Sequence, residues 1–258
     1  MRRTAGVLIC LIIVCTPWPA AAERLVVSLS THRVAITSSF NGEDLVLFGT
    51  IEPDDRGGAL RSNYDLVVTV TGPRDTFRTR RKERFLGIWI NMDTREFVSV
   101  PSYLAVLANR AVKDIASAET LRRLQMGLDN YILPQRIGPD IAGTVSDDPY
   151  RLAFIRLESD QGLYREQSNA VTFLTPTVFR AAIPLPAYVP TGTYLIDVKL
   201  FSGGTLVGHT NTALEIIKAG FEQYVADAAR DHGLLYGVVT ALIALVTGWL
   251  ASIIFRRD

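Results

Sequence analysis

The residues with the clearest potential for chemistry form a basic run between positions 74 and 84. Arg or Lys occupies positions 74, 78, 80, 81, 82 and 84, and only Asp75 and Glu83 interrupt the run with negative charge. If this stretch is a β-strand, Arg78, Arg80 and Lys82 share one face, because successive side chains alternate. Such a face could bind an anionic ligand, lipid headgroups or an acidic partner. The alternative is a solvated edge strand, whose charges block unwanted pairing.

Sequence patterns of catalytic and metal sites are missing. The chain has no Gly-x-Ser-x-Gly turn, His-Glu-x-x-His, Gly-x-Gly-x-x-Gly or P-loop motif. The three histidines, His32, His209 and His232, are widely spaced, and a single strand histidine is more often structural than catalytic. The pairs Asp54-Asp55 and Asp147-Asp148 fit a turn and a helix cap better than a Ca²⁺ site. We therefore predict no catalytic, cofactor-binding or metal-binding residues, and a protein that is not an enzyme.

The N-terminus has the order of a secretory signal peptide. Arg2 and Arg3 precede a short apolar run, and Ala20 and Ala22 form a small-x-small cleavage site. We predict a signal peptide at residues 1–22, with an uncleaved anchor as the alternative. The only two cysteines lie inside it, so the exported chain would have no disulfide or thiolate site. With 27 basic and 26 acidic residues in the whole chain, no net field favours nucleic acid as a partner.

The C-terminal region contains a long uncharged stretch. Leu234 to Phe255 carries no charged residue, and a helix of this length covers about 33 Å against a hydrocarbon core of about 30 Å. We predict a transmembrane helix at residues 233–255 and a tail at 256–258. Arg256 and Arg257 follow the span, so the positive-inside rule places the tail in the cytoplasm and the body outside it.

The predicted span has a row of small residues. Thr240, Ala244, Gly248 and Ser252 recur every four residues and share one face, and Gly233, Gly237 and Ala241 form a second row. Small side chains let helix backbones approach closely, which favours helix–helix contact in lipid. We predict contact with an integral-membrane partner or self-association. The alternative is the general abundance of Gly and Ala in membrane helices.

The exported body is predicted to be mainly β. Period-two alternation, as in Leu66, Val68 and Val70, recurs in short stretches between turn signals. These stretches are Leu25–Ser30, Arg33–Thr37, Glu43–Ile51, Tyr64–Thr71, Thr76–Lys82, Gly87–Ile90, Phe97–Val100 and Tyr103–Ala108. Short strands at this spacing predict an immunoglobulin-like β-sandwich over residues 23–109.

The middle of the chain changes to helical signals. Ser117 can cap a helix that starts at Ala118, and Asp148 can cap a second one with Pro149 in its first position. We expect residues 110–166 to be a helical insertion on the sandwich. Strands return in residues 167–218, which could complete the first sandwich or form a second, and residues 219–232 are predicted to be a helical stalk.

Several strings together resemble a known family, the alphaproteobacterial putative transmembrane protein family. They are Val178-Phe179-Arg180-Ala181, Pro184-Leu185-Pro186, Val189 to Tyr194, Lys218 to Glu222, and Gly248-Trp249-Leu250 through Arg257, with Phe48-Gly49 and Gly87 to Asn91 nearer the front. The resemblance implies an inner-membrane protein of a Gram-negative cell that faces the periplasm. It implies no catalytic residues, and it associates the chain with a neighbouring permease of the sulfite-exporter type.

Two functions from different classes agree with these features. The leading hypothesis is a non-enzymatic accessory or interaction module for a membrane partner, such as an anion exporter of the sulfite type. The alternative is a periplasmic ligand-binding or sensor subunit for a small anion, with the basic run near its binding site. An enzyme of unfamiliar design is the third hypothesis, and it lacks the clustered polar residues that site chemistry requires.

Overall fold

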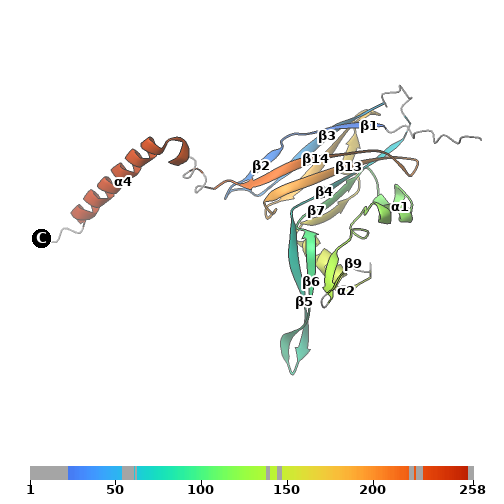
Figure 1. The fold of residues 1–258 in the computed structure, drawn as a ribbon, viewed down its shortest axis with the longest axis horizontal. Helices are drawn as coiled ribbons and strands as arrows, with labels where there is room; N and C mark the ends of the chain where they lie inside the picture. Colours follow the sequence, from blue (N-terminus) through green and yellow to red (C-terminus); the bar gives the residue numbers. More distant parts are fainter. Residues whose placement is uncertain are drawn as a thin grey trace, which may run out of the picture.

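The computed structural model describes residues 23–53, 61, 63–137, 140–143, 147–220, 224 and 229–254. The predicted signal peptide, the tail and half of the predicted stalk lie outside these ranges. Within them the protein is mainly β and carries one apolar C-terminal helix, as predicted (Figure 1).

The elements fall into two strand-rich regions around a mixed middle. The strands are β1 (Arg24–Leu29), β2 (Arg33–Ile36), β3 (Gly42–Glu52), β4 (Tyr64–Thr71), β5 (Arg74–Phe85), β6 (Ile88–Pro101), β7 (Leu104–Ala108), β8 (Pro134–Ile137), β9 (Asp140–Gly143), β10 (Tyr164–Gln167), β11 (Val171–Phe173), β12 (Val178–Pro186), β13 (Gly192–Ser202) and β14 (Thr205–Lys218). The helices are a 3-10 turn (Val112–Asp114), α1 (Ala118–Arg123), α2 (Pro149–Asp160) and α4 (Gly233–Ile254).

Two of the three sheets pack face to face as a sandwich. The first sheet has the order β1-β3-β12-β11, and the second has the order β10-β7-β4-β13-β14-β2. All neighbours in the first sheet are antiparallel, whereas β10 and β2 run parallel to their partners in the second. The first order matches the ABED sheet of an immunoglobulin domain, and β4-β13-β14 within the second matches its CFG strands. These orders favour the immunoglobulin-like shape, which stays a prediction.

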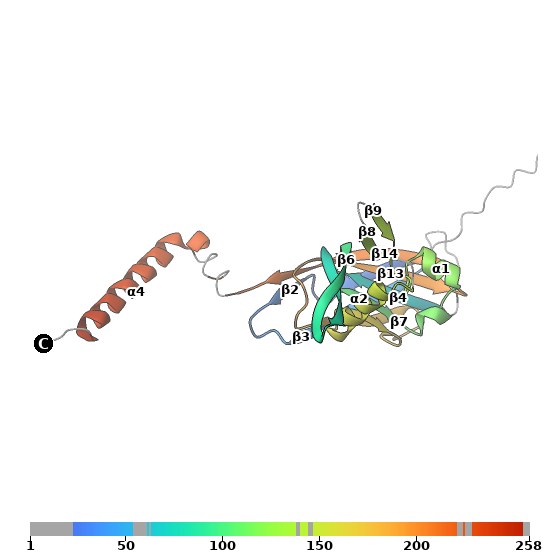
Figure 2. The same cartoon turned by 90° about the horizontal axis from the view of Figure 1, so that it is seen from below.

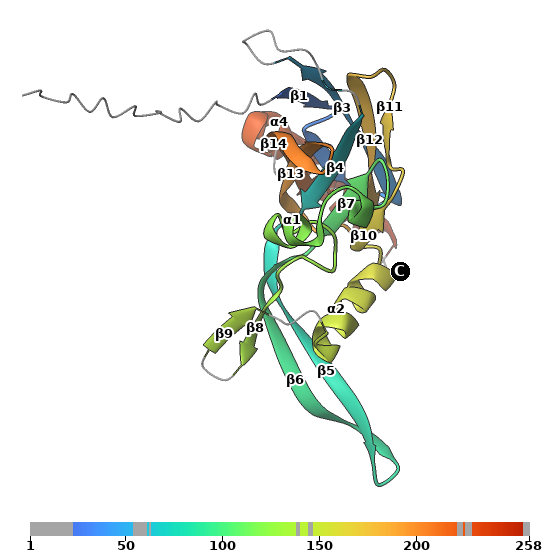
Figure 3. The same ribbon diagram turned by 90° about the vertical axis from the view of Figure 1, so that its right-hand side faces the viewer.

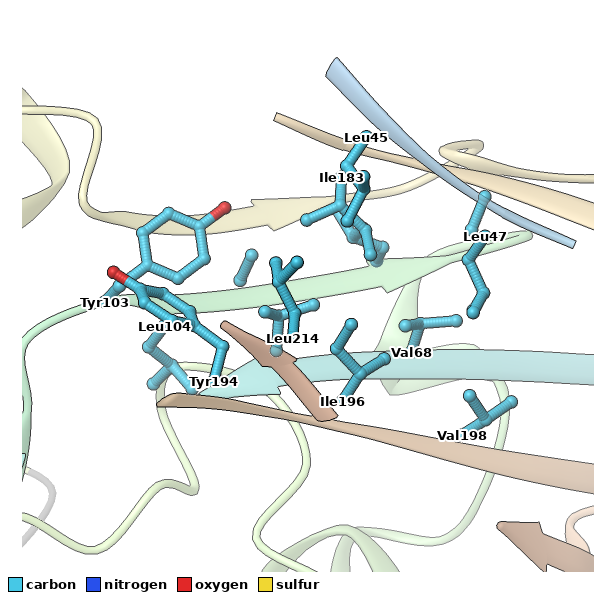
Figure 4. Close-up of a cluster of buried hydrophobic side chains, with 14 of the residues drawn as sticks. Leu45, Leu47, Val68, Tyr103, Leu104, Ile183, Tyr194, Ile196, Val198 and Leu214 are labelled. Carbon is cyan, nitrogen blue, oxygen red and sulfur yellow. The ribbon is translucent and has the colours of Figure 1, made fainter. Parts of the chain in front are cut away.

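The core lies between these two sheets. Leu47 and Ile183 of the first sheet meet Val68 and Ile196 of the second, and all four side chains are fully buried (Figure 4). At one end of the core, the Tyr103 hydroxyl donates a hydrogen bond of 2.6 Å to a carbonyl oxygen on β12. Alternation along each strand therefore produces one shared apolar layer.

The two strand-rich regions of the chain build the same sandwich. Strand β12 pairs with β3 in the first sheet, and β13 pairs with β4 in the second. Residues 167–218 therefore complete the first sandwich and do not form a second one. Strand β4 is also buried on its outer face, where Val67 packs with Leu121 of α1 and with Phe201 of β13.

The third sheet begins with a long hairpin, β5–β6, that projects away from the sandwich (Figure 3). The predicted strands Thr76–Lys82, Gly87–Ile90 and Phe97–Val100 were too short, because the last two are parts of one strand. Register shifts next to Phe77 and Lys82 break the alternation along the ladder, and Ser99 adopts a φ of 54° near the first shift. Such bulges make one bent strand read as separate short ones.

The middle segment is mixed. Ser117 caps α1, and Asp148 caps α2 by accepting a hydrogen bond from the backbone N–H of Arg151, so both predicted caps are confirmed. The segment 110–166 also contains β8, β9 and β10, which the prediction of a helical insertion missed. Strand β8 extends the hairpin sheet by pairing with β6, and β10 adds an edge to the second sheet beside β7.

Helix α4 stands apart from the sheets (Figure 2). The stretch Gly233–Ile253 has a mean hydropathy of 2.1, and none of it is buried in the described structure. By length and composition it could cross a membrane. This is the candidate span that the sequence predicts.

Candidate functional site: a basic groove beside α2 and the small-residue face of α4

The three basic residues predicted to share a face have different surroundings. Arg78 points to Glu96 on β6, with a nitrogen–oxygen distance of 3.2 Å. Glu96 is shared with Arg136 of β8, whose side chain approaches it to 3.3 Å. The Arg78 guanidinium is thus held by a carboxylate across the hairpin, whereas Arg80 and Lys82 lie farther along β5.

Arg80 and Lys82 line a groove between β5 and α2. The groove has a volume of about 370 Å³ and is lined by Thr79, Arg80, Arg81, Lys82, Pro149, Tyr150, Ala153, Arg156 and Leu157. One wall therefore carries three consecutive basic residues, and the other combines apolar side chains with Arg156. A groove of this composition suits an anion that also has an apolar part.

The groove is positioned by aromatic packing under α2. The Phe154 ring lies 4.6 Å from that of Phe97 and 5.6 Å from that of Phe77, measured between centroids. Tyr164 meets the same ring edge-on at 5.6 Å. Because Phe154 is buried against both hairpin strands, the adjacent side of α2, with Ala153 and Arg156, is fixed beside the basic wall.

A hydrogen bond ties the start of α2 to the hairpin. The Tyr150 hydroxyl donates to Asp93 Oδ2 at 2.6 Å, and the Arg95 guanidinium lies 5.3 Å from the Tyr150 ring centroid. This hydrogen bond lowers the pKa of Asp93 and raises the pKa of Tyr150. Asp93 therefore stays ionised beside the groove, which limits how much anionic charge the groove attracts.

Three of the groove's four cations have no ionic partner in the described structure. Arg81 pairs with Glu83 on its own strand. Among the described residues, Arg80, Lys82 and Arg156 form no ion pair. Their charges are free to interact with a ligand, and their exposure to water weakens each interaction.

The predicted basic run contains three of the groove's cations, Arg80, Arg81 and Lys82, whereas Arg156 was not predicted. Arg156 comes from a helix more than 70 positions away, and a strand–helix contact of this kind has no signal in a single sequence. Glu96, which forms an ion pair with Arg78, lies only 18 positions away, but the sequence does not show that the two strands place these residues opposite each other.

The small-residue face of α4 lies where the sequence placed it. Thr240, Ala244, Gly248 and Ser252 all fall within the helix. A Cβ atom added at Gly248 would meet nothing within 4 Å, and the same is true of Gly237. The Thr240 hydroxyl donates to the carbonyl of Tyr236 at 2.6 Å, so it is satisfied inside its own helix. No described element covers this face.

The histidines show no common site. His209 Nε2 lies 2.5 Å from Asp197 Oδ1, and Asp197 also pairs with Lys199 on the outer face of the second sheet. The backbone carbonyl of His32 accepts the N–H of Glu215. Within the described residues no group of three or more His, Cys, Asp or Glu side chains could hold a metal ion. Of the two Asp-Asp pairs in the sequence, Asp148 of the second acts as a helix cap. The first pair, Asp54-Asp55, lies outside the described residues.

A comparison with protein families relates the chain to one of them. The family model described as Putative transmembrane protein (Alph_Pro_TM) matches residues 24–257. The match covers the sandwich, the hairpin, the groove and α4 together. A search of curated proteins finds no match to the chain.

Proposed function

Because the chain belongs to this family of putative transmembrane proteins, we propose that it is a non-enzymatic accessory module for an integral-membrane partner. The chain is a membrane protein with one candidate span, α4. The proposal adds that the sandwich works outside the cytoplasm and that α4 is the place where the partner binds.

One observation carries the proposal: the small-residue face of α4 is uncovered. Gly248 and Gly237 leave open space beside the helix. The Thr240 hydroxyl donates its hydrogen bonds to backbone carbonyls of the same helix. Lipid tails are as apolar as the helix surface, so the hydrophobic effect does not drive helices together in a bilayer. Helices associate there through close packing, which small side chains allow. A plain anchor gains nothing from such a row.

The proposed orientation follows from the sequence at both ends. A cleaved signal peptide at 1–22 would export the body, and Arg256-Arg257 would keep the tail in the cytoplasm. The protein then resides in the inner membrane with its sandwich in the periplasm. The first partner to test is an anion exporter of the sulfite type, the association that the family resemblance suggests.

The test replaces Gly248 with Leu in the full chain. A leucine side chain would hold two helices apart, so crosslinking to the partner in native membranes should fall about tenfold, whereas membrane insertion should be unchanged. Partner recovery is measured by crosslinking followed by pulldown and mass spectrometry. Unchanged recovery would show that α4 is only an anchor.

A matched control uses the other side of the same helix. Val246 lies two residues before Gly248, which places it about 200° around the helix. Val246→Phe enlarges an apolar side chain on that side of the helix and should leave crosslinking at the wild-type level. If both variants weaken recovery equally, the small-residue face has no special role.

The groove beside α2 favours a second candidate function, binding of a small anion. The supporting observation is that Arg80, Lys82 and Arg156 line one groove and have no ion pair with a described residue. Three converging cations can hold an oxyanion through charge-assisted hydrogen bonds. The protein would then sense or deliver the anion that its partner handles.

Calorimetry on the full chain in lipid nanodiscs tests this function. Sulfite, sulfate and phosphate are titrated into the wild type and into an Arg80→Gln, Arg156→Gln double variant, with Arg78→Gln as the control outside the groove. Binding should weaken by at least tenfold in the double variant and change little in the control. Absence of heat and of a thermal shift with all three anions would eliminate this function.

A further inference from the structure

The tip of the β5–β6 hairpin carries a cluster of exposed apolar side chains. Leu86 is 88% exposed and Trp89 is 68% exposed. The other exposed apolar residues around them are Phe85, Ile88 and Met92. Single exposed apolar side chains are ordinary on protein surfaces, but a cluster of large ones marks an interaction site. The hairpin holds this cluster well away from the sandwich (Figure 3).

The turn at the tip is unfavourable for its own sequence. Leu86 has a φ of 49° and Gly87 a φ of 89°, so both central residues of the two-residue loop lie in the left-handed region, as in a type I′ turn. Asn or Gly is the residue that suits the first position, and a leucine there is conformationally strained. A strained, exposed leucine indicates selection for its apolar side chain rather than for folding.

Both faces of the ribbon are apolar at the tip. Phe85 pairs with Ile88 across the ladder, and Arg84 pairs with Trp89 in the next position. Paired residues lie on the same face and successive pairs on opposite faces, so Phe85 and Trp89 point in opposite directions. A flat protein partner would cover one face only. A fluid apolar phase would surround the tip and cover both.

Basic side chains lie directly behind the apolar tip. Arg84 and Lys82 follow on β5, with Arg81 and Arg80 farther back, while Glu83 is paired with Arg81. Lys and Arg at this distance from an apolar tip fit the headgroup level of an anionic bilayer, and Trp is favoured at the same level. The length of the apolar tip matches the depth to which interfacial elements enter a bilayer, roughly 5–10 Å.

The hairpin also starts from the end of the sandwich that leads to the anchor. Pro73, just before β5, would lie 3.0 Å from a Cβ atom on Gly192, and Gly192 pairs with Ile216 near the end of β14. Strand β5 is about 40 Å long at ~3.3 Å per residue. The connection 219–232 can span at most about 50 Å. Chain length therefore allows the tip and α4 to meet one bilayer.

We propose that the tip of the β5–β6 hairpin, from Phe85 to Trp89, inserts into the interfacial layer of an anionic lipid membrane, the one that holds α4. Insertion is shallow, because a two-stranded ribbon has unpaired backbone groups along its edges that cannot enter the hydrocarbon core. With α4 embedded, the body is held at two points. The tip acts at high effective concentration and needs little affinity of its own. This inference requires only that α4 spans a membrane, and no protein partner.

The test places a polarity-sensitive dye at the tip of the full chain. In a background of Cys10→Ser and Cys15→Ser, Ile88→Cys is labelled with a nitrobenzoxadiazole dye and reconstituted into vesicles of phosphatidylcholine with or without phosphatidylglycerol. Leu174→Cys is the control, because Leu174 is also exposed but precedes β12 at the opposite end of the sandwich. We expect a blue shift and quenching by shallow nitroxide lipids at position 88, stronger with phosphatidylglycerol, and neither at 174.

Two results would overturn the proposal. A dye at position 88 that remains in water shows that the tip does not insert. A blue-shifted dye that no nitroxide lipid quenches shows that protein, from a partner or a second copy, covers the tip.

Leu86→Asn separates insertion from folding. Asparagine suits the type I′ position, so this variant should fold as well as the wild type or better, and the dye at position 88 should lose most of its lipid quenching. Arg84→Gln with Lys82→Gln should instead abolish the difference between the two vesicle compositions. If quenching persists at the wild-type level in Leu86→Asn, the apolar tip is not what binds the bilayer.

Discussion

At the scale of single residues, α2 carries two buried charged side chains that differ in their hydrogen bonding. The Arg151 guanidinium donates hydrogen bonds to the carbonyl oxygens of Leu128, Asp129 and Tyr131, at 2.9 to 3.1 Å. It therefore fixes the loop that leads into β8. Glu158 is 7% exposed, and its Oε2 has no hydrogen-bond partner among the described residues. Burial raises the pKa of Glu158.

Replacing Glu158 with Gln should stabilise the protein at neutral pH. Because the pKa of Glu158 is raised by folding, the native state holds a proton that the unfolded state releases as pH rises above the usual carboxyl range. Wild-type stability consequently falls through that window. The variant cannot titrate, so it should gain on the order of 1 kcal/mol at pH 7. The gain should vanish below about pH 3.5, where both states of the wild type are protonated.

Thermal unfolding of the full chain measured across pH tests this expectation. Glu43→Gln is the matched control, because Glu43 is exposed on β3. It should show little change at any pH. A destabilised Glu158→Gln at pH 7 would mean that the ionised carboxylate has a stabilising role that the described contacts do not include.

The sequence predicted side-chain direction better than side-chain partners. Alternation placed Leu66, Val68 and Val70 on one face, and all three are in the core. The same alternation predicted one face for Arg78, Arg80 and Lys82, but Arg78 forms an ion pair with Glu96 on the neighbouring strand. Direction depends on the local backbone, whereas an ion pair depends on which strand lies opposite. A single sequence carries no record of that register.

At the scale of elements, the parts with local signals were predicted closely. The caps at Ser117 and Asp148 use side chains within three residues of the N–H groups that they bind. The hairpin β5–β6 was missed as one element because bulges interrupt its pattern and because a leucine stands where a turn residue was expected. Both departures from local rules occur in the element proposed to touch the membrane.

This coincidence has a physical reason. The part of a hairpin that extends past its neighbouring third strand is marginally stable in water. In the described part of the chain, β8 pairs with β6 at Glu96 and Phe97. Packing of α2 against Phe77 and Phe97 supports its base. The tip then has little stabilisation of its own, so an unfavourable turn there persists only where another interaction, such as contact with lipid, makes the apolar side chain useful.

At the scale of the whole molecule, the order of strands in space differs from their order along the chain. Each sheet combines strands from residues 23–109 with strands from 167–218, and the two groups meet at the β3–β12, β4–β13 and β14–β2 pairs. Periodicity finds the strands but cannot decide between one sandwich and two, because β3–β12 and β4–β13 pairing joins segments more than a hundred residues apart. The middle segment and the hairpin are then insertions within one folding unit.

A fragment of residues 23–109 should therefore be unfolded by itself. It retains β4 and β7, but β4 loses β13, β3 loses β12, and buried Ile183, Ile196 and Leu214 are missing from the core. With its apolar faces in water, the fragment cannot offset its loss of chain entropy. We expect no cooperative thermal transition and no near-ultraviolet circular dichroism from it. Residues 23–218, which keep every strand, should give one cooperative transition. A fragment 23–109 that unfolds cooperatively would show instead that the first strands form an independent domain, and that the pairing of β3 with β12 only docks two finished parts.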